Sequence, residues 1–239
     1  MLVTGSIFVV CSGLKNIGII MGNKKTFLKY LDTYVFIDVS NIRLACMKTL
    51  GFRPDFVKIL RYFQSKSPNL RDIRYYEGIA DDDEKKRKMF DFLGQKGYTI
   101  CSLERKAYTS IQIEKREAKC PKCGYQWTAK LSNEHKVMKS NVDVYLASDM
   151  VATASHANGK PVRVILVSCD GDYTEAIKNV LAINPNASVV VWATPYVKNY
   201  RKNTLSARLK NLVKEVGKPR FLLCSIEDIR PKIESDLKV

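Results

Sequence analysis

The sequence predicts an α/β protein with a parallel β-sheet covered by helices on both faces. Apolar segments rich in β-branched and aromatic residues alternate along the chain with segments in which apolar residues recur at helical spacing. One apolar segment, Val162–Val167, is continuous rather than alternating, which is typical of a strand buried on both faces. Because strands that alternate with helices form βαβ units, the sheet is expected to be parallel and doubly covered.

Predicted strands and helices alternate along the chain, with one interruption. The predicted strands are Tyr34–Ile37, Ile73–Tyr76, Tyr98–Leu103, Val162–Val167, Ser188–Trp192 and Phe221–Cys224. The predicted helices are Pro54–Phe63, Asp83–Gly94, Val142–Ser155, Tyr173–Ile183 and Thr204–Val216. Residues 104–140 are strongly basic and lack a long apolar period, so we expect a small insertion there. Residues 1–32 are expected to be an N-terminal extension.

Composition narrows the classes of function. The chain has 239 residues, 46% of them hydrophobic, and a formal net charge of +16. This charge favours nucleic acid as the partner, then an anionic membrane surface, with solubility alone as the alternative. The longest apolar run near the start, Ile7–Cys11, is too short to span a membrane. Seven cysteines in scattered contexts favour a reducing compartment, so we expect a cytoplasmic protein.

Carboxylates directly follow two of the predicted strands. Asp38 comes after Tyr34–Ile37, while Asp170 and Asp172 come after Val162–Val167 with a single glycine between them. Because a parallel sheet places the carboxyl ends of its strands at one edge, these acids are expected to meet there. Converging carboxylates repel one another, and a divalent cation is the usual relief.

A further acid lies at the start of the helix that follows the insertion. Asp143, Ala147 and Met150 follow the spacing of one helical stripe, so Asp143 would head a small apolar face turned toward the sheet. An acid in that position is unfavourable unless it is paired, capped or bound to a metal. The alternative is an acid that stabilises the helix N-terminus through the helix dipole. Asp149 lies about 120° from this face and is the weaker candidate.

Three short motifs, in this order, resemble those of a known family. They are Asp38–Asn41 after a strand, Asn141–Met150 at a helix start and Val167–Tyr173 after a strand. The segments Tyr76–Gly78 and Leu93–Tyr98 also look like the family's strand, helix and glycine-tyrosine strand start. Over about residues 33–230 the chain resembles the NYN domain, in its LabA-like branch.

The resemblance implies a three-layer fold over residues 33–232, similar to PIN and 5′-nuclease domains, that binds Mg²⁺ or Mn²⁺ and hydrolyses RNA phosphodiester bonds. Carried onto this sequence, the catalytic residues would be Asn41 and four metal-binding aspartates, Asp38, Asp143, Asp170 and Asp172. Ser168 would order the loop. Cys169 stands where the family more often has glycine, and Gly171 where serine or another small residue is common. Gly171 would restore the backbone freedom lost at Cys169.

Phosphodiester hydrolysis suits this donor set on chemical grounds. Metal ions held by carboxylates neutralise charge on the leaving oxygen and lower the pKa of an attacking water. Carboxylate and water oxygens favour Mg²⁺ and Mn²⁺. The two histidines, His135 and His156, are expected at the surface. The chain has neither a GxxxxGK[ST] nor a GxGxxG motif, so nucleotide-driven or dinucleotide chemistry is poorly supported.

The insertion contains a C-x-x-C-G motif formed by Cys120 and Cys123. Such a motif is half of a zinc knuckle because it presents two thiolates from one tight turn, whereas a closed structural Zn²⁺ site needs four ligands. The remaining ligands would come from Cys101, from His135, or from a second knuckle on a partner chain in a homodimer. The alternative is a degenerate knuckle without metal.

Basic residues concentrate in the insertion and after the fifth predicted strand, which fits binding to a phosphate backbone. The residues expected to bind nucleic acid are Lys119, Lys122, Lys139, Lys198, Arg201 and Lys202. Tyr125 and Trp127 would stack on bases or pack around the knuckle. RNA, single-stranded or structured, is favoured over duplex DNA because no recognition helix or finger motif is evident. Two functions stay open: a metal-dependent endoribonuclease, and a non-catalytic RNA-binding or scaffold protein with the same fold.

Overall fold

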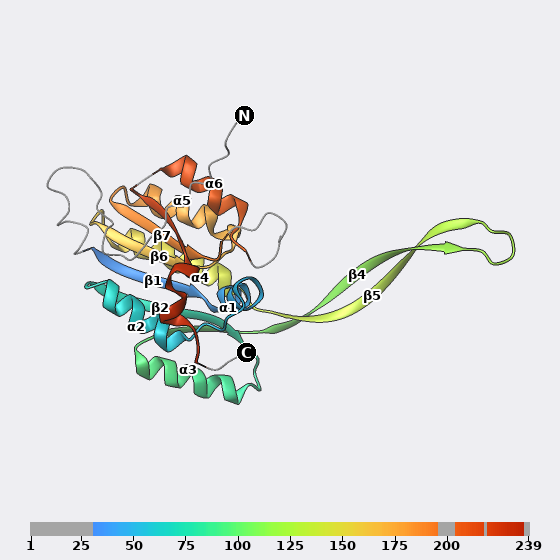
Figure 1. The fold of residues 1–239 in the computed structure, drawn as a ribbon, viewed down its shortest axis with the longest axis horizontal. Helices are drawn as coiled ribbons and strands as arrows, with labels where there is room; N and C mark the ends of the chain where they lie inside the picture. The colour runs from blue at the N-terminus through green and yellow to red at the C-terminus, as the bar shows by residue number, and fades with distance from the viewer. Residues whose placement is uncertain (1–30, 196–203, 218, 237–239) are drawn as a thin grey trace.

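The centre of the molecule is a six-stranded sheet with the strand order β3-β2-β1-β6-β7-β8 (Figure 1). The computed structural model describes residues 31–195, 204–217 and 219–236. The strands of the sheet are β1 (Asp32–Asp38), β2 (Leu70–Ile79), β3 (Thr99–Glu104), β6 (Val162–Val167), β7 (Ala187–Ala193) and β8 (Phe221–Ser225). Each neighbouring pair is parallel, so the predicted α/β class and parallel sheet are confirmed.

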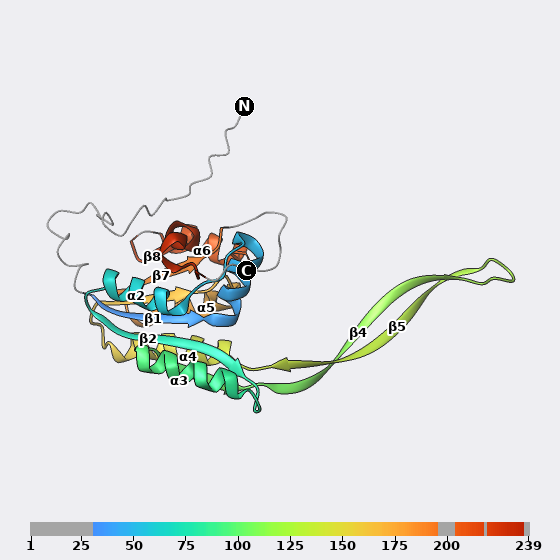
Figure 2. The same cartoon turned by 60° about the horizontal axis from the view of Figure 1, so that its bottom comes forward.

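Helices cover both faces of the sheet (Figure 2). They are α1 (Val39–Ala45), α2 (Phe56–Lys66), α3 (Glu84–Lys96), α4 (Val142–His156), α5 (Thr174–Ile183), α6 (Ala207–Val216) and α7 (Arg230–Ile233), with the short turns η3 (Cys46–Leu50), η4 (Gly171–Tyr173) and η5 (Ile226–Ile229). Two neighbouring residues of β2 show the layering, because successive side chains of a strand point to opposite faces. Tyr75 packs edge-on against Phe56 of α2 and Phe90 of α3, whereas Tyr76 packs against Tyr145 of α4.

The strand order reverses direction between β1 and β6 at the centre of the sheet. The chain runs outward from β1 through β2 to β3, and from β6 through β7 to β8 on the other side. Open sheets of this kind form a crevice at the carboxyl ends of the two central strands, because the connections leave in opposite directions. Ile37 pairs with Val167, the last residue of β6. Asp38 and the loop after β6 therefore leave the sheet next to one another.

Helix α1 was not expected from the sequence. It has seven residues, which is too few to display a helical period, and it begins directly after β1. The side chain of Asp38 caps its N-terminus by accepting a hydrogen bond from the backbone N–H of Asn41. The other predicted helices and strands are present with ends that differ by a few residues, as is usual for boundaries inferred from sequence.

The insertion is a long antiparallel hairpin, which we call the arm and which consists of β4 (Lys106–Lys119), β5 (Gln126–Lys139) and the turn between them. The arm projects away from the helices and the sheet (Figure 1). Each strand has 14 residues, which corresponds to about 45 Å at the usual rise. The expected small knuckle-like insertion is thus an extended antiparallel hairpin with the Cys120–Cys123 motif in its turn.

The arm leaves the molecule from the carboxyl edge of the sheet, between β3 and α4. At this point Gly78 of β2 lies under the two ends of the arm. A Cβ atom on Gly78 would lie 3.0 Å from both the Cβ of Ser140 and the Nε of Arg105. The absence of a side chain at Gly78 thus allows both ends of the arm to approach the sheet closely.

Two expectations concern other parts of the chain. Among the helices in the three described segments, none has the length and apolar character of a membrane span. The expected N-terminal extension, residues 1–32, lies outside the described residues except for its last two positions.

The close approach at Gly78 generates a stability prediction. We expect Gly78→Ala to lower the free energy of unfolding by about 1–3 kcal/mol, because the added methyl group would push Ser140 and Arg105 away. Gly94→Ala is the matched control: it lies in α3, its nearest neighbouring atom would be 3.8 Å away, and helix propensity should raise stability by about 0.5–1 kcal/mol. Urea unfolding of both variants measures the difference. Equal stability of Gly78→Ala and the unmodified protein would contradict the prediction.

Candidate active site

The carboxyl group of Asp38 is the centre of the candidate site. Asp38 is the last residue of β1 and is 4% exposed. Its Oδ1 accepts the Asn41 backbone N–H at 3.2 Å. Its Oδ2 accepts hydrogen bonds from the Ser168 hydroxyl at 3.1 Å and from the Tyr173 hydroxyl at 3.2 Å. The donors come from α1, from the loop after β6 and from η4, so this carboxyl group links three segments.

Tyr173 connects Asp38 to a second acid. Its hydroxyl also lies 3.4 Å from Oδ1 of Asp143, which is in the first turn of α4. A phenol hydroxyl has one hydrogen, so it can donate to only one of the two carboxylates at a time. The buried face of α4 is formed by Val142, Leu146 and Met150 with their neighbours. Asp143 therefore lies at the margin of this face, whereas the sequence spacing predicted that it would be the first residue of the face. This placement leaves Asp143 exposed.

The loop after β6 is ordered by side chains that bridge its backbone. Ser168 is fully buried and accepts the backbone N–H of Asp170 at 3.1 Å, so it orders this loop as expected. Oδ1 of Asp170 accepts the backbone N–H of Asp172 at 3.0 Å. Asn41 accepts the Cys169 N–H through its side-chain oxygen at 2.9 Å. Asn41 therefore joins the loops after β1 and β6, which is a positioning contact.

Gly171 and Asp172 contact the segment that begins α6. A Cβ atom on Gly171 would lie 2.9 Å from the Cβ of Ser206, the N-cap residue of that helix. The backbone of Gly171 does not have a positive φ, so close approach rather than conformational freedom requires glycine here, contrary to expectation. Asp172 is exposed and forms an ion pair with Arg208 at 3.3 Å. This ion pair directs the Asp172 carboxylate toward α6.

Burial and mutual repulsion raise the pKa of two of these acids. Burial, followed by repulsion from Asp143, raises the pKa of Asp38 from its ordinary value of 3.8 to about 7. The pKa of Asp143 is also raised, first by partial burial and then by repulsion from Asp170 and Asp172. The four acids therefore influence one another across this edge of the sheet. A nearby cation would reverse both shifts, because it stabilises the ionised forms.

The donor set fits a hard divalent cation. Within the described segments, no three His, Cys, Asp or Glu side chains converge closely enough to hold a metal. Mg²⁺ is commonly bound by one or two carboxylates together with waters and substrate phosphates, so Asp38 and Asp143 suffice as protein ligands. Asp143 repels the ionised Asp38 carboxylate, and the two acids share one donor, the Tyr173 hydroxyl. A cation bound between them would relieve this repulsion. Participation of Asp170 and Asp172 as ligands stays a prediction.

A buried ion cluster adjoins the site on the next strand. Glu77 of β2 is 2% exposed, and its carboxylate pairs with Arg43 of α1 and Lys86 of α3, both at 2.9 Å. Burial raises the pKa of Glu77, but the two cations outweigh it and the pKa is lowered. Asp38 pairs with Tyr76, the residue before Glu77, so Glu77 and its two cations lie on the opposite face of the sheet from Asp38.

Sequence reasoning missed the roles of Tyr173 and Glu77. Tyr173 directly follows the second acid of its motif, and Glu77 lies in the strand-end segment Tyr76–Gly78. Their positions beside predicted site motifs are the signals in the sequence that could have indicated a role. The residues that they contact, however, are distant in the sequence. Tyr173 contacts Asp38, which is 135 positions away, and Glu77 contacts Arg43, which is 34 positions away.

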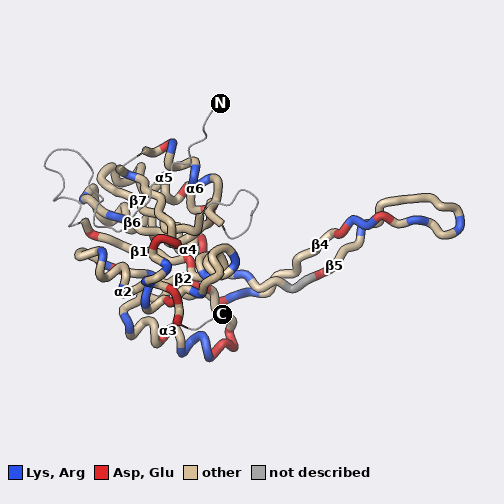
Figure 3. The backbone as a smooth tube through the Cα atoms, viewed as in Figure 1, with Lys and Arg blue, Asp and Glu red and all other residues tan. Residues whose placement is uncertain are grey.

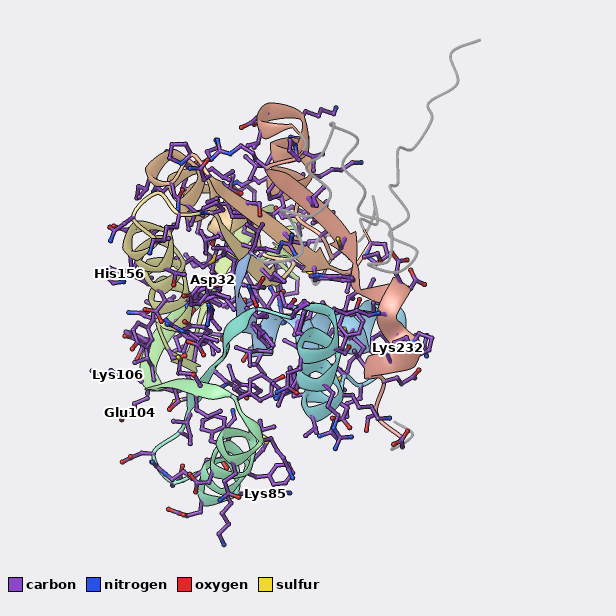
Figure 4. The ribbon with its side chains drawn as sticks, turned by 90° about the vertical axis from the view of Figure 1, so that its left-hand side faces the viewer. Asp32, Lys85, Glu104, Lys106, His156 and Lys232 are labelled. Atoms are coloured by element: carbon purple, nitrogen blue, oxygen red, sulfur yellow. The ribbon has the colours of Figure 1, made fainter. Side chains whose placement is uncertain are left out.

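Asp149, the weaker candidate for the acidic site, and His156, an expected surface residue, lie away from the acids. Asp149 accepts a hydrogen bond from Tyr76 at 2.6 Å and pairs with Arg74 at 2.9 Å, which indicates a packing role. His156 is exposed at the end of α4 opposite to Asp143, as expected for a surface residue. Figure 4 shows the molecule from the side opposite to the arm, with His156 and Asp32 labelled. Asp32 starts β1 and Asp38 ends it, so His156 belongs to the other edge of the sheet.

The arm separates the Cys120–Cys123 motif from two of its expected ligands. Cys101 is buried in β3 of the main sheet, about 45 Å from the turn at the length of the arm. His135 is paired with Ser110 along the arm, nine positions after Gln126 and so about 30 Å from the start of β5. Neither residue completes a zinc site with the motif in one chain. Both expectations are therefore wrong, for the simple reason that an extended hairpin keeps these positions apart.

The basic residues of the insertion lie at the base of the arm and in its outer part (Figure 3). The predicted nucleic-acid contacts Lys119, Lys122 and Lys139 are all exposed. The other predicted contacts, Lys198, Arg201 and Lys202, lie outside the described residues. Along the arm, Lys115 is directly opposite Lys130 and Lys106 is directly opposite Lys139. Like charges opposite one another destabilise a hairpin, so these pairs favour an anionic partner.

The raised pKa of Asp38 predicts how stability depends on pH without divalent cations. Between about pH 4 and 7 the folded protein keeps a proton on Asp38 that the unfolded chain has released. The free energy of unfolding is therefore highest below about pH 4 and falls as the pH rises toward 7. The loss is on the order of a few kcal/mol. Thermal melting in chelator across this range should show the decline. Asp38→Asn should reduce the decline to the part that the raised pKa of Asp143 contributes, while Asp91→Asn, an exposed acid on α3, should keep it. An unchanged decline in Asp38→Asn would contradict this assignment.

Comparisons with known proteins identify the family of this chain. No curated protein gives a significant match. Among solved structures, the chain is similar to VPA0982, a protein of unknown function from Vibrio parahaemolyticus, at 20% identity and a TM-score of 0.52, over 84% of this chain and 96% of that one. Ribokinase from Giardia lamblia matches at 16% identity and a TM-score of 0.34, over 78% and 57%. The family model of the NYN domain, a PIN-like nuclease family, matches residues 32–213. The chain therefore belongs to the NYN domain family.

Proposed function

We propose that this protein is a metal-dependent endoribonuclease. The observation that carries the proposal is the pair of acids, Asp38 and Asp143, that share the Tyr173 hydroxyl at the carboxyl edge of the sheet. Asp38 and Asp143 would hold Mg²⁺ or Mn²⁺, with Asp170 and Asp172 beside them. Membership of the NYN family supports a nuclease activity and RNA as the substrate.

The chain's own residues have distinct parts in this proposal. When bound, the cation would neutralise phosphodiester charge and lower the pKa of an attacking water. Ser168 and Tyr173 fix the orientation of the Asp38 carboxylate by donating to its Oδ2. Asp170 is only partly buried, so its carboxylate would accept a proton from a water near the phosphate. Asn41 keeps the Asp170 loop beside Asp38 through its bond to Cys169.

The arm would bind the RNA beyond the cleaved bond. It begins at the same edge as the acids, since its second strand leads directly into Asn141 and α4. The opposed pairs Lys115–Lys130 and Lys106–Lys139 place positive charge on both of its faces, because consecutive cross-strand pairs alternate between faces. A phosphate backbone would relieve the repulsion within each pair. RNA binding by the arm therefore follows from charge rather than from base recognition.

A non-catalytic RNA-binding or scaffold protein is the second candidate. It is favoured by the ion pair between Asp172 and Arg208 and by the absence of a three-ligand metal group among the described residues. Both candidates share the arm and differ only in turnover. For the compartment, the buried single thiols Cys46, Cys169 and Cys224 support our expectation of the reducing cytoplasm.

Cleavage of RNA tests the proposal directly. With Mn²⁺ or Mg²⁺, the unmodified protein should cut single-stranded RNA, and a chelator should abolish cutting. Asp143→Asn should reduce the rate by about 100-fold or more, because metal-assisted charge stabilisation amounts to several kcal/mol. Asp91→Asn, exposed on α3, is the charge-matched control and should leave the rate unchanged. Binding of RNA without any cleavage in either metal would support the non-catalytic candidate instead.

The salt dependence of RNA affinity tests the arm. Six phosphate contacts would give a slope of about −4 for log affinity against log salt concentration, at about −0.7 per contact on single strands. Replacing Lys115, Lys119 and Lys122 by Gln should make this slope shallower by about 2. The control replaces three exposed lysines of α3, Lys85, Lys88 and Lys96, and removes the same charge. Equal slopes for both triple variants would exclude the arm as the binding surface.

A further inference from the structure

The turn of the arm presents two thiols side by side. The backbone N–H of Cys120 donates to the Tyr125 carbonyl at 2.8 Å, and the N–H of Gly124 donates to the Cys120 carbonyl at 3.0 Å, which closes a tight turn. Gly124 has a φ of 73°, a conformation that favours glycine. Inside the turn, the backbone N–H groups of Lys122 and Cys123 donate to the Cys120 sulfur, and the Cys123 thiol also contacts it. This is the arrangement in which one turn offers two thiolates to a metal.

Two thiolates leave a zinc ion without half of its ligands. Cys101 and His135 are too far away, and the part of the chain that the structure describes contains no three-residue metal group. The missing pair must therefore come from outside this arm. The arm is also the most protruding feature of the molecule, with its turn at the far end (Figure 1). Its turn can meet the turn of another copy while the helices and sheets stay apart.

We propose that Cys120 and Cys123 of two copies of this chain together bind one Zn²⁺ ion and join the copies at the turns of their arms. The site is incomplete without the second copy, which contributes the same two thiolates. Four thiolates from two turns give the closed tetrahedral coordination of a structural zinc site. This inference does not depend on the nuclease activity.

The charge around the turn matches such a site. A zinc ion with four thiolates carries net negative charge, so nearby cations stabilise it. Lys122 lies between the two cysteines, and the side chain of Lys119 extends over the turn, with its Cε 3.8 Å from the position of a Cβ on Gly124. Without the thiolates and metal, two such turns would repel each other. These lysines therefore oppose the pairing of two turns without zinc and favour their pairing when zinc is bound.

An apolar surface lies next to the thiols. Tyr125 and Trp127 stack with their ring centroids 6.3 Å apart, although they are 68% and 45% exposed. A second turn seated on the metal would cover these rings, since they adjoin Cys123 and Gly124 in the chain. Burial of aromatic surface would add to the metal bonds. Isolated two-stranded hairpins are marginally stable in water, so a metal clamp at the turn would also order the arm.

The test measures zinc content and mass of the full chain purified under reducing conditions. We expect about half an equivalent of zinc per chain and a dimer by light scattering. A chelator should convert the dimer to a monomer, and Zn²⁺ alone should restore it. Cys120→Ser and Cys123→Ser should each abolish both zinc and dimer. Co²⁺ in place of Zn²⁺ should give the absorption spectrum of a tetrahedral four-thiolate site.

Controls separate this site from a folding defect and from the candidate active site. The thiols lie in an exposed turn, so the Cys variants should keep the thermal transition of the main sheet. Asp143→Asn should keep zinc and dimer, whatever its nuclease activity. One zinc per monomeric chain, a monomer without zinc, an intramolecular disulfide between the two cysteines, or a dimer that survives both chelator and Cys120→Ser would each overturn the proposal.

Discussion

Burial of the Asp38 carboxyl group is the constraint on which the site depends. A buried carboxyl group without partners would destabilise the fold, so its oxygens must be satisfied by nearby donors. The donors are the Asn41 backbone, the Ser168 hydroxyl and the Tyr173 hydroxyl, which come from three separate segments. Each segment is therefore held in position by the same acid. The loops at the crevice between β1 and β6 are ordered because Asp38 lies between them.

The electrostatic contrast along this edge follows from the same constraint. Burial and then repulsion from Asp143 raise the pKa of Asp38, and burial and then repulsion from Asp170 and Asp172 raise the pKa of Asp143. On the next strand, Arg43 and Lys86 pair with Glu77. Phosphate groups would be repelled by the acids. An RNA backbone would thus approach the acids closely only when a cation compensates them. The proposed cation would thus account for a group of acids at one edge of a chain whose formal net charge is +16.

The sheet could be predicted from the sequence because its strands are continuous apolar runs, and Val162–Val167 is identical to β6. The acids could be placed because their positions at strand ends follow from chain order alone. Tyr173 and Glu77 could not be placed, since their contacts join residues distant in the sequence. The insertion was located, but its hairpin structure was missed because its apolar residues, such as Ile111 and Ile113, remain exposed to solvent. Sequence patterns report burial, so a hairpin that does not pack on the core gives no comparable signal.

The arm connects the edge of the sheet that carries the acids to a turn that carries two thiols. At its base, Gly78 allows it to start beside the acids, and at its end the turn carries two thiols. Between them, basic residues lie at the base and in the outer part of the arm. If two arms are joined at their turns, one RNA can contact two basic surfaces that belong to one assembly. The second contact is then intramolecular, which raises the effective affinity without any new recognition element. Under both proposals, charge on the arm and pairing at its end would act on the same step, the retention of a long RNA near the acids.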